Sequence, residues 1–221
     1  MSKVLNIIVE GPTETEFVTQ CLRPYFNNKG FFNIRPIGIE TSPGFKGGDV
    51  RYSRYKKHIQ TILRGQEDLL VTSLIDFYRL RNDFPKFDEA QKIQNNIVQK
   101  VDFLEQACFE DINDHRFIPY IQLHEFEGLL FTKIDGFNDF PDLAPNSRQE
   151  LEQIIHDFPN PELINEGATT APSKRLLRLV PDYQKPFHGN YIALTNGLDA
   201  IFEKCPRFNA WIETLVERMN G

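Results

Sequence analysis

Short apolar runs alternate with amphipathic segments along the first part of the chain. The apolar runs are rich in β-branched residues, which predicts buried strands, and the spacing of apolar positions between them predicts helices. Strands that alternate with helices favour crossover units and a mostly parallel sheet. We therefore predict an α/β, Rossmann-like core with about four strands. The predicted strands cover 4–9, 32–39, 69–77 and 116–123, and the predicted helices cover about 17–26, 52–65 and 88–110.

The pattern changes after Phe131, where an irregular, proline-bearing stretch covers 134–146. The segments that follow have helical periodicity and no strand signal. We predict two parts, an α/β core over 1–132 and a helical C-terminal section over 133–221. Because the connection does not resemble a flexible linker, we expect the two parts to pack together. The predicted C-terminal helices cover 147–158, 173–180, 191–205 and 207–219.

Composition places the chain among globular proteins, and its charge argues only weakly about whether nucleic acid is a partner. The chain has 221 residues, enough to bury a sizeable core, and it has no apolar run long enough to span a bilayer. Three cysteines lie far apart and the N-terminus lacks a secretory pattern, which favours a reducing cytoplasm. A net charge of −6 argues mildly against broad nucleic-acid binding, but basic residues concentrate in 45–57 and 172–186.

Acidic residues follow three of the predicted strands. Glu10 follows the first strand, Asp76 lies at the end of the third, and Glu125 and Glu127 come after the fourth. Ligands of open α/β sheets bind outside the carboxyl ends of the strands, and carboxylates there suit Mg²⁺ or Mn²⁺. Any one of these residues alone is more often a turn residue or a helix cap. Their number at one sheet edge predicts a metal site able to act on a phosphodiester.

The segment "VEGPTETEF" contains three glutamates that we expect to differ in role. Thr13 and Glu16 have the spacing of a capping box, and Glu14 would suit the dipole of a first helical turn. Gly11 permits a tight turn between strand and helix. Glu10 lies outside the box, on the strand side, and has no local structural role. We therefore predict that Glu10 is the glutamate with a chemical function.

Further candidates have structural alternatives of comparable weight. His124 could be a general base or a ligand, although a histidine beside a buried strand is more often a hydrogen-bonded core residue. Tyr78 could position a phosphate or a water molecule, or could simply pack. Basic residues in the two positive segments could contact nucleic-acid phosphates, or could form solvated surfaces. The basic candidates are Lys46, Arg51, Lys56, Lys174, Arg175 and Lys185.

A strand that ends in "VEG", a following "TE" and a later strand that ends in "DFY" resemble the toprim fold. This fold is the catalytic core of topoisomerases, DnaG-type primases, OLD-family nucleases and small nucleases that mature ribosomal RNA. The resemblance implies that Glu10 is a general acid/base or metal-bound glutamate and that Asp76 is a metal ligand. Tyr78 stands where the toprim pattern has a second Asp. From the strand order we infer that Glu125, with Glu127 second, replaces that carboxylate.

The ordered segments "VEGPTETEF", "DFYRL", "HEFEGLLF", "APSKRLLRL" and "CPRFNAWI" narrow the resemblance. Together they are similar to a toprim-like family of uncharacterised prokaryotic proteins, over about residues 4–215. The resemblance extends to the nuclease subunit of the PARIS anti-phage system, which an ATPase partner holds and which attacks RNA once released. It implies a metal-dependent nuclease-like fold more firmly than it implies a substrate.

The leading expectation is a metal-dependent nuclease that hydrolyses phosphodiester bonds of RNA or DNA, in anti-phage defence. The alternative is a partner-regulated effector or binding module whose metal site is weak or lost, which the tyrosine at position 78 would fit. A small-molecule phosphoesterase on the same scaffold is the third class, and a deep closed pocket at the strand ends would favour it. An ATPase partner and a homo-oligomer are compatible with these expectations. Association with a membrane is not expected.

Overall fold

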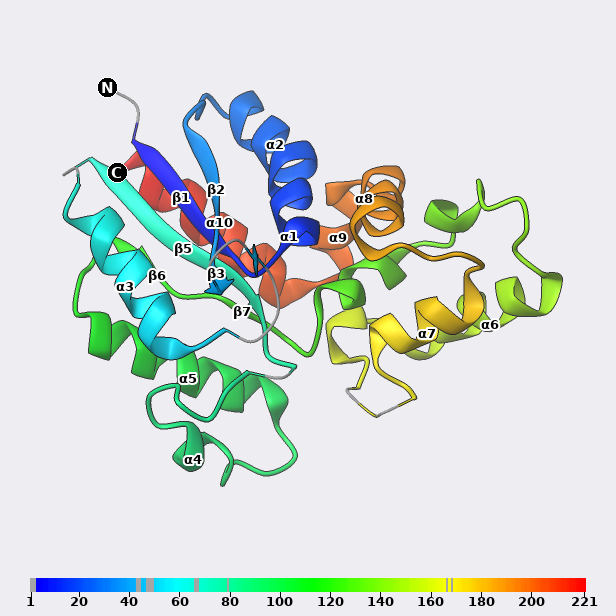
Figure 1. The fold of residues 1–221 in the computed structure, drawn as a ribbon. Coiled ribbons are helices and arrows are strands. Elements are labelled where there is room, and N and C mark those ends of the chain that lie inside the picture. The colour runs from blue at the N-terminus through cyan, green and yellow to red at the C-terminus, as the bar shows by residue number, and fades with distance from the viewer. Residues whose placement is uncertain are drawn as a thin grey trace.

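A parallel sheet forms the centre of the structure, a computed structural model that describes residues 3–42, 45–46, 50–65, 68–78, 80–165, 167 and 169–221 (Figure 1). The side chains of 40–42 and 45–46 are outside this description. All neighbouring strands of the central sheet run parallel, which confirms the predicted α/β class. The order is β2 (Ile34–Gly38), β1 (Val4–Val9), β5 (Leu69–Asp76) and β6 (Phe117–Ile118), with β7 (Ile121–Gln122) also paired to β5.

The strand register brings the carboxyl ends of β1, β5 and β7 to one edge of the sheet. Val9 pairs with Leu74, and Asp76 pairs with Gln122. The strand predicted over 116–123 is interrupted between β6 and β7 at Pro119, which has no amide hydrogen to donate to the ladder. The residues that follow β1 and β5 therefore share this edge with the chain that leaves β7.

Helices connect the strands largely where the apolar periodicity predicts them. The predicted helix over 88–110 is divided, because Asn95 adopts a positive φ and the side chain of Asn96 caps a new helix. The loop predicted before the second helix contains a short antiparallel pair of strands. These elements are α1 (Pro12–Phe17), the π-helix η1 (Val18–Leu22), α2 (Arg23–Asn28), β3 (Glu40–Ser42), β4 (Phe45–Lys46), α3 (Tyr52–Leu63), α4 (Phe87–Ala90) and α5 (Ile97–Ile112).

The C-terminal section is helical, as predicted. The helix expected over 191–205 is two helices, because Gly197 adopts a φ of +77° at the break. Helical structure begins before the predicted boundary at residue 132, because the chain forms a 3₁₀-helix at Phe126, shortly after β7. The elements are η2 (Phe126–Thr132), η3 (Asp135–Phe137), α6 (Pro145–Asp157), η4 (Pro161–Leu163), α7 (Pro172–Leu179), α8 (Lys185–Asn196), α9 (Leu198–Lys204) and α10 (Pro206–Asn220).

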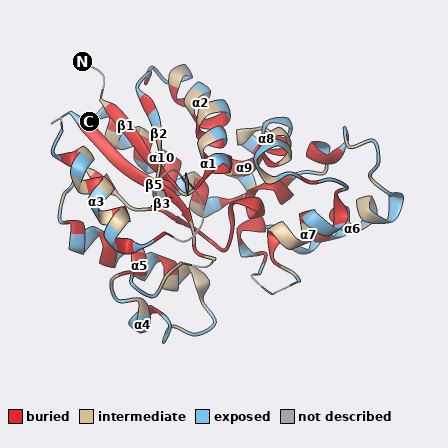
Figure 2. Cartoon of the chain, viewed as in Figure 1, coloured by how far each residue is buried: buried red, intermediate tan, exposed pale blue. Residues whose placement is uncertain are grey.

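Two hydrophobic cores lie on the two faces of the sheet, and its central strands β1 and β5 are buried along nearly their whole length (Figure 2). Side chains of β1 alternate between the cores, with Ile7 in one and Ile8 in the other. The Ile7 core also contains α1 and the C-terminal helices. Trp211 of α10 stacks on Tyr120 at 4.3 Å, and its indole N–H donates to the Thr72 hydroxyl at 2.8 Å. The C-terminal section thus packs on the sheet, while a boundary at residue 132 stays a prediction.

Candidate functional site

Four carboxylate groups lie around one ammonium group at the carboxyl edge of the sheet. Glu10 follows β1, Glu14 belongs to α1, Asp76 ends β5 and Glu127 belongs to η2; we call these four residues the acidic cluster. The Nζ of Lys185, the first residue of α8, lies 3.1 Å from Glu127 Oε1, 3.9 Å from Asp76 Oδ2 and 4.0 Å from Glu14 Oε1. The cluster therefore joins both parts of the chain.

Local structure fixes the direction of two carboxylates in the acidic cluster. Gly11 is the N-cap of α1, and its backbone N–H donates to Glu14 Oε2 at 2.9 Å. The backbone N–H of Phe126 donates to Asp76 Oδ1 at 2.8 Å, which joins the start of η2 to the end of β5. The second oxygen of each carboxylate faces Lys185. Backbone donors thus anchor one side of the cluster and leave the other side for a cation.

Burial makes the negative charge of the acidic cluster unfavourable. It raises the pKa of Glu127 to about 7, with Lys185 opposing the shift. Burial and the charge of Glu14 raise the pKa of Glu10, also to about 7, while Lys185 and a hydrogen bond from the Asp76 backbone oppose the rise. Burial holds the pKa of Asp76 well above its usual range. For Lys185, burial is outweighed by the neighbouring carboxylates, which raise its pKa and keep it an ammonium.

Glu127 is the most isolated member of the acidic cluster. Its side chain has no exposed surface. Its Oε1 lies 3.1 Å from the ammonium of Lys185, and its Oε2 has no hydrogen-bond partner among the residues that the structure describes. The nearby hydroxyl of Tyr183 is also buried, and it has no hydrogen-bond partner among the described residues. Buried polar atoms are nearly always paired, so the unpartnered Oε2 of Glu127 indicates a place for a further ligand.

The structure brings together three of the four predicted carboxylates. It places Glu127, and not Glu125, beside Asp76 and Glu10. Glu10, Asp76 and Glu127 meet in the acidic cluster. Glu125 turns to the start of α7, where its Oε2 accepts from the Ser173 N–H and its Oε1 accepts from the Ser173 hydroxyl, both at 2.9 Å. Its charge still raises the pKa of Glu127. Glu127, the second choice from the sequence, is therefore nearer the centre of the site.

The predicted capping box over Thr13 and Glu16 is wrong. Because α1 begins at Pro12, Glu14 occupies the third helical position and reaches back to Gly11, while Glu16 is exposed and accepts from the side chain of Gln20. A proline in the first helical turn is the sequence signal that would have placed the box correctly. Glu14 thereby enters the site, a position that its place in the sequence pattern did not predict.

Tyr78 and His124 lie beside Asp76, where two connections leave the sheet. The Tyr78 N–H donates to the His124 backbone oxygen at 2.7 Å, and His124 adopts a positive φ. His124 is buried, whereas Tyr78 is half-buried. Their backbones extend the pairing of β5 with β7 by one step, so both residues have a structural role at this edge.

The predicted basic residues do not form one surface. The ammonium of Lys56 on α3 pairs with Asp111 at 2.8 Å, and Arg175 on α7 donates to the Thr170 carbonyl at 2.7 Å. Helices α3 and α7 lie on opposite sides of the molecule (Figure 1). Lys185 belongs to the acidic cluster. Of the remaining candidates, Arg51 is exposed before α3, Lys174 is half-buried on α7, and the Lys46 side chain lies outside the described residues.

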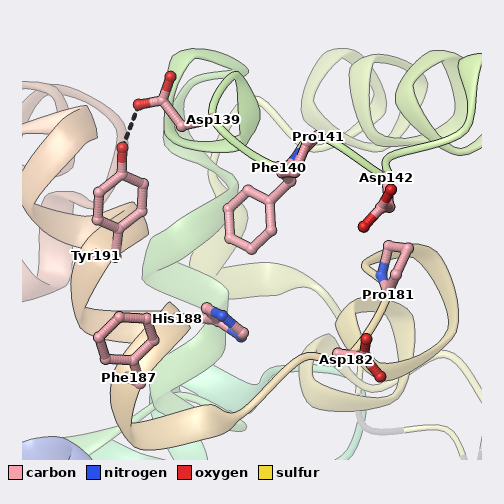
Figure 3. Close-up of a pocket in the computed structure, with 9 residues that line it drawn as sticks. All are labelled: Asp139, Phe140, Pro141, Asp142, Pro181, Asp182, Phe187, His188 and Tyr191. Carbon is pink, nitrogen blue, oxygen red and sulfur yellow. Dashed lines mark hydrogen bonds between the residues drawn. The ribbon is translucent and has the colours of Figure 1, made fainter.

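A pocket of about 390 Å³ lies beside the first turns of α8 (Figure 3). Figure 3 shows the rings of Phe187 and Tyr191 on one side and the carboxylates of Asp142 and Asp182 on the other. Its carboxylates repel phosphate, so this pocket is not a place for a nucleic-acid backbone. It is lined by Asp139, Phe140, Pro141, Asp142, Pro181, Asp182, Phe187, His188 and Tyr191.

The acidic cluster has the donor chemistry of a site for a hard divalent cation, but not the arrangement of one. Mg²⁺ prefers carboxylate oxygens, and Oε2 of Glu127 is such an oxygen without a partner among the described residues. As they stand, however, no three Asp, Glu, His or Cys side chains among the described residues could hold a metal ion together. The ammonium of Lys185 supplies the positive charge instead.

Comparison with known proteins gives one match. The family model "Domain of unknown function (DUF4276)" matches residues 9–216, which is nearly the whole chain. No curated protein and no solved structure matches. Among the described helices, none has the length and apolar character needed to cross a membrane.

Proposed function

Because the chain belongs to the family described as a domain of unknown function (DUF4276), we propose its function from the acidic cluster: metal-dependent hydrolysis of phosphodiester bonds in RNA or DNA. The observation that carries this proposal is the convergence of Glu10, Asp76 and Glu127 at the carboxyl edge of a parallel sheet. This edge is the usual ligand-binding position in such sheets.

The residues of the cluster would divide the work of holding Mg²⁺ or Mn²⁺. When bound, such an ion polarises a phosphoryl oxygen and lowers the pKa of a bound water molecule. Asp76 is held by the Phe126 amide through one oxygen, which orients the other toward the site. Glu127 is held in an enclosed environment that excludes water from its carboxylate. Glu10 would supply a third carboxylate.

The resemblance to the toprim fold supports this assignment. The toprim pattern has a Glu after the first strand and an Asp after the third, which are Glu10 and Asp76 here. Tyr78 stands in place of the second Asp, and Glu127 is positioned to replace that carboxylate. The resemblance to the PARIS nuclease subunit adds a role in cytoplasmic anti-phage defence and an ATPase partner to the proposal.

The alternative function is a partner-regulated effector or binding module without a catalytic metal. One observation favours it: Lys185 already balances part of the charge of the acidic cluster. In this case the cluster is a buried ion-pair network that fixes α8 against the sheet, and nucleic-acid hydrolysis is absent.

Purified full-length protein with Mn²⁺ and labelled single-stranded RNA, tRNA and duplex DNA separates the two functions. We expect cleavage by the unchanged protein and at least a 100-fold loss in Asp76→Asn and Glu127→Gln, which preserve shape but remove a charged oxygen ligand. Glu16→Gln is the matched control, because Glu16 is an exposed glutamate outside the cluster. Cleavage that survives both cluster variants would refute the proposed site, and absence of both cleavage and metal binding would favour the module.

A further inference from the structure

Lys185 is the only described cation that forms ion pairs with the acidic cluster, and it contacts three of its members at once. Its Nζ is 3.1 Å from Glu127 Oε1, while the other oxygen of that carboxylate, Oε2, has no hydrogen-bond partner among the described residues. A Mg²⁺ ion binds carboxylate oxygens at about 2.1 Å. An ammonium at that position therefore occupies the space and the charge-balancing role that a metal ion would have.

We propose that Lys185 is a tethered counter-ion that holds the acidic cluster together in the metal-free protein and leaves when a divalent cation binds. This inference rests on the proposed metal dependence of the site. It explains why the described acidic side chains do not stand in a metal-binding arrangement: they are organised around the ammonium instead. Metal ion and lysine thus compete for the same oxygens.

The position of Lys185 in the fold allows such a displacement. It is the first residue of α8, and its side chain is 39% exposed, whereas that of Glu127 has no exposed surface. The flexible four-carbon stem of a lysine can move its strongly hydrated ammonium into water without moving the backbone. The carboxylates remain in place, because Glu14 and Asp76 are anchored by the backbone amides of Gly11 and Phe126.

The unpaired hydroxyl of Tyr183 is a second sign that the metal-free arrangement lacks a ligand. This hydroxyl is buried and has no hydrogen-bond partner in the described structure. After burial itself, the charge of Glu127 is the largest cause that raises the pKa of Tyr183. The ammonium of Lys185 satisfies neither this hydroxyl nor the second oxygen of Glu127. A metal ion with its bound water molecules would offer donors to both.

Metal affinity is the first test, and it needs no enzymatic activity. Lys185→Met keeps most of the stem and removes the charge. We expect it to bind Mn²⁺ at least ten-fold more tightly than the unchanged protein by isothermal titration calorimetry. Lys133→Met removes the same charge from an exposed lysine outside the cluster and should change the affinity by less than two-fold. Equal or weaker binding by Lys185→Met overturns the proposal.

Chemical labelling of the unchanged protein is the second test and does not depend on how a variant folds. Acetylation of lysines by an N-hydroxysuccinimide ester, followed by peptide mass spectrometry, should label Lys185 several-fold faster with Mg²⁺ than with a chelator, and Lys133 equally in both. Unchanged labelling of Lys185 in a protein that binds metal and cleaves nucleic acid overturns the counter-ion role alone. Failure of both the unchanged protein and Lys185→Met to bind metal overturns this proposal and the proposed function together.

Discussion

The metal-free protein should lose stability as the pH rises from about 6 to 8, because of two carboxyl groups in the acidic cluster. Folding raises the pKa of Glu10 and of Glu127 from 4.5 to about 7. Between these two values the folded protein keeps protons that the unfolded chain has released. Stability therefore falls with pH in this range, and the contribution of these protons is lost as the pH passes through 7.

The size of the effect follows from the two pKa shifts. Each pKa unit corresponds to about 1.4 kcal/mol, so a rise from 4.5 to about 7 corresponds to about 3 kcal/mol for either carboxyl group alone. Glu10 and Glu127 share Lys185 as counter-ion and titrate as a coupled pair, so the two contributions do not simply add. The loss is about 3 kcal/mol in total from pH 4.5 to above 7, of which about 1.4 kcal/mol per carboxyl group falls between pH 6 and 8. A typical domain has a stability of about 5–15 kcal/mol, so this loss is measurable.

Urea denaturation with a chelator present measures this loss directly. Trp211 is the single tryptophan and is buried, so its fluorescence reports global unfolding. We expect the free energy of unfolding to decrease from pH 6 to 8, and the decrease to shrink in a Glu10→Gln, Glu127→Gln double variant. Glu16→Gln should retain the full decrease. A free energy of unfolding that stays constant or increases over this range would show that the two carboxyl groups are not held as described.

Three further predictions concern metal binding and the packing of the C-terminal section. Millimolar Mg²⁺ should raise the melting temperature of the unchanged protein but not of Asp76→Asn, because the variant lacks a charged ligand. Glu162→Ala should lower the free energy of unfolding in urea by about 1–3 kcal/mol, because the buried carboxylate accepts two backbone hydrogen bonds from the first turn of α10, at 2.9 and 3.1 Å. Trp211→Phe and Thr72→Val should each cost about 1 kcal/mol through their shared hydrogen bond, and a double-mutant cycle should show the losses to be non-additive.

The centre of the sheet was predictable because β1 and β5 are buried on both faces. Such strands appear in sequence as continuous apolar runs, and the first and third of them match β1 and β5 closely. The errors lie where single residues override the periodicity. Pro119 interrupts the last strand. Asn95, with a positive φ, and the N-cap Asn96 precede the start of α5 inside a segment with continuous helical periodicity. The residue types at these positions carry the signal, but the apolar period does not.

The candidate site was predictable only as far as strand order determines it. Glu10 and Asp76 follow neighbouring parallel strands, so their meeting follows from topology. Glu125 and Glu127 are two residues apart, and which one enters the site depends on the 3₁₀ turn of η2 and on Ser173. The contact of Lys185 with the cluster depends on tertiary packing of α8, which leaves no local pattern in the sequence.

The contribution of Lys185 makes the acidic cluster a property of the whole chain rather than of the α/β core. Glu10, Glu14, Asp76 and Glu127 all belong to the first 132 residues, whereas the described ammonium that balances them belongs to the C-terminal section. Removing one partner of a buried ion pair leaves a charge without compensation, which is far more unfavourable than never having formed the pair. A sheet without α8 would therefore hold its carboxylates only in protonated form or around a metal ion. The electrostatics of the site thus couple the folding of the two sections, in addition to the hydrophobic core that they share.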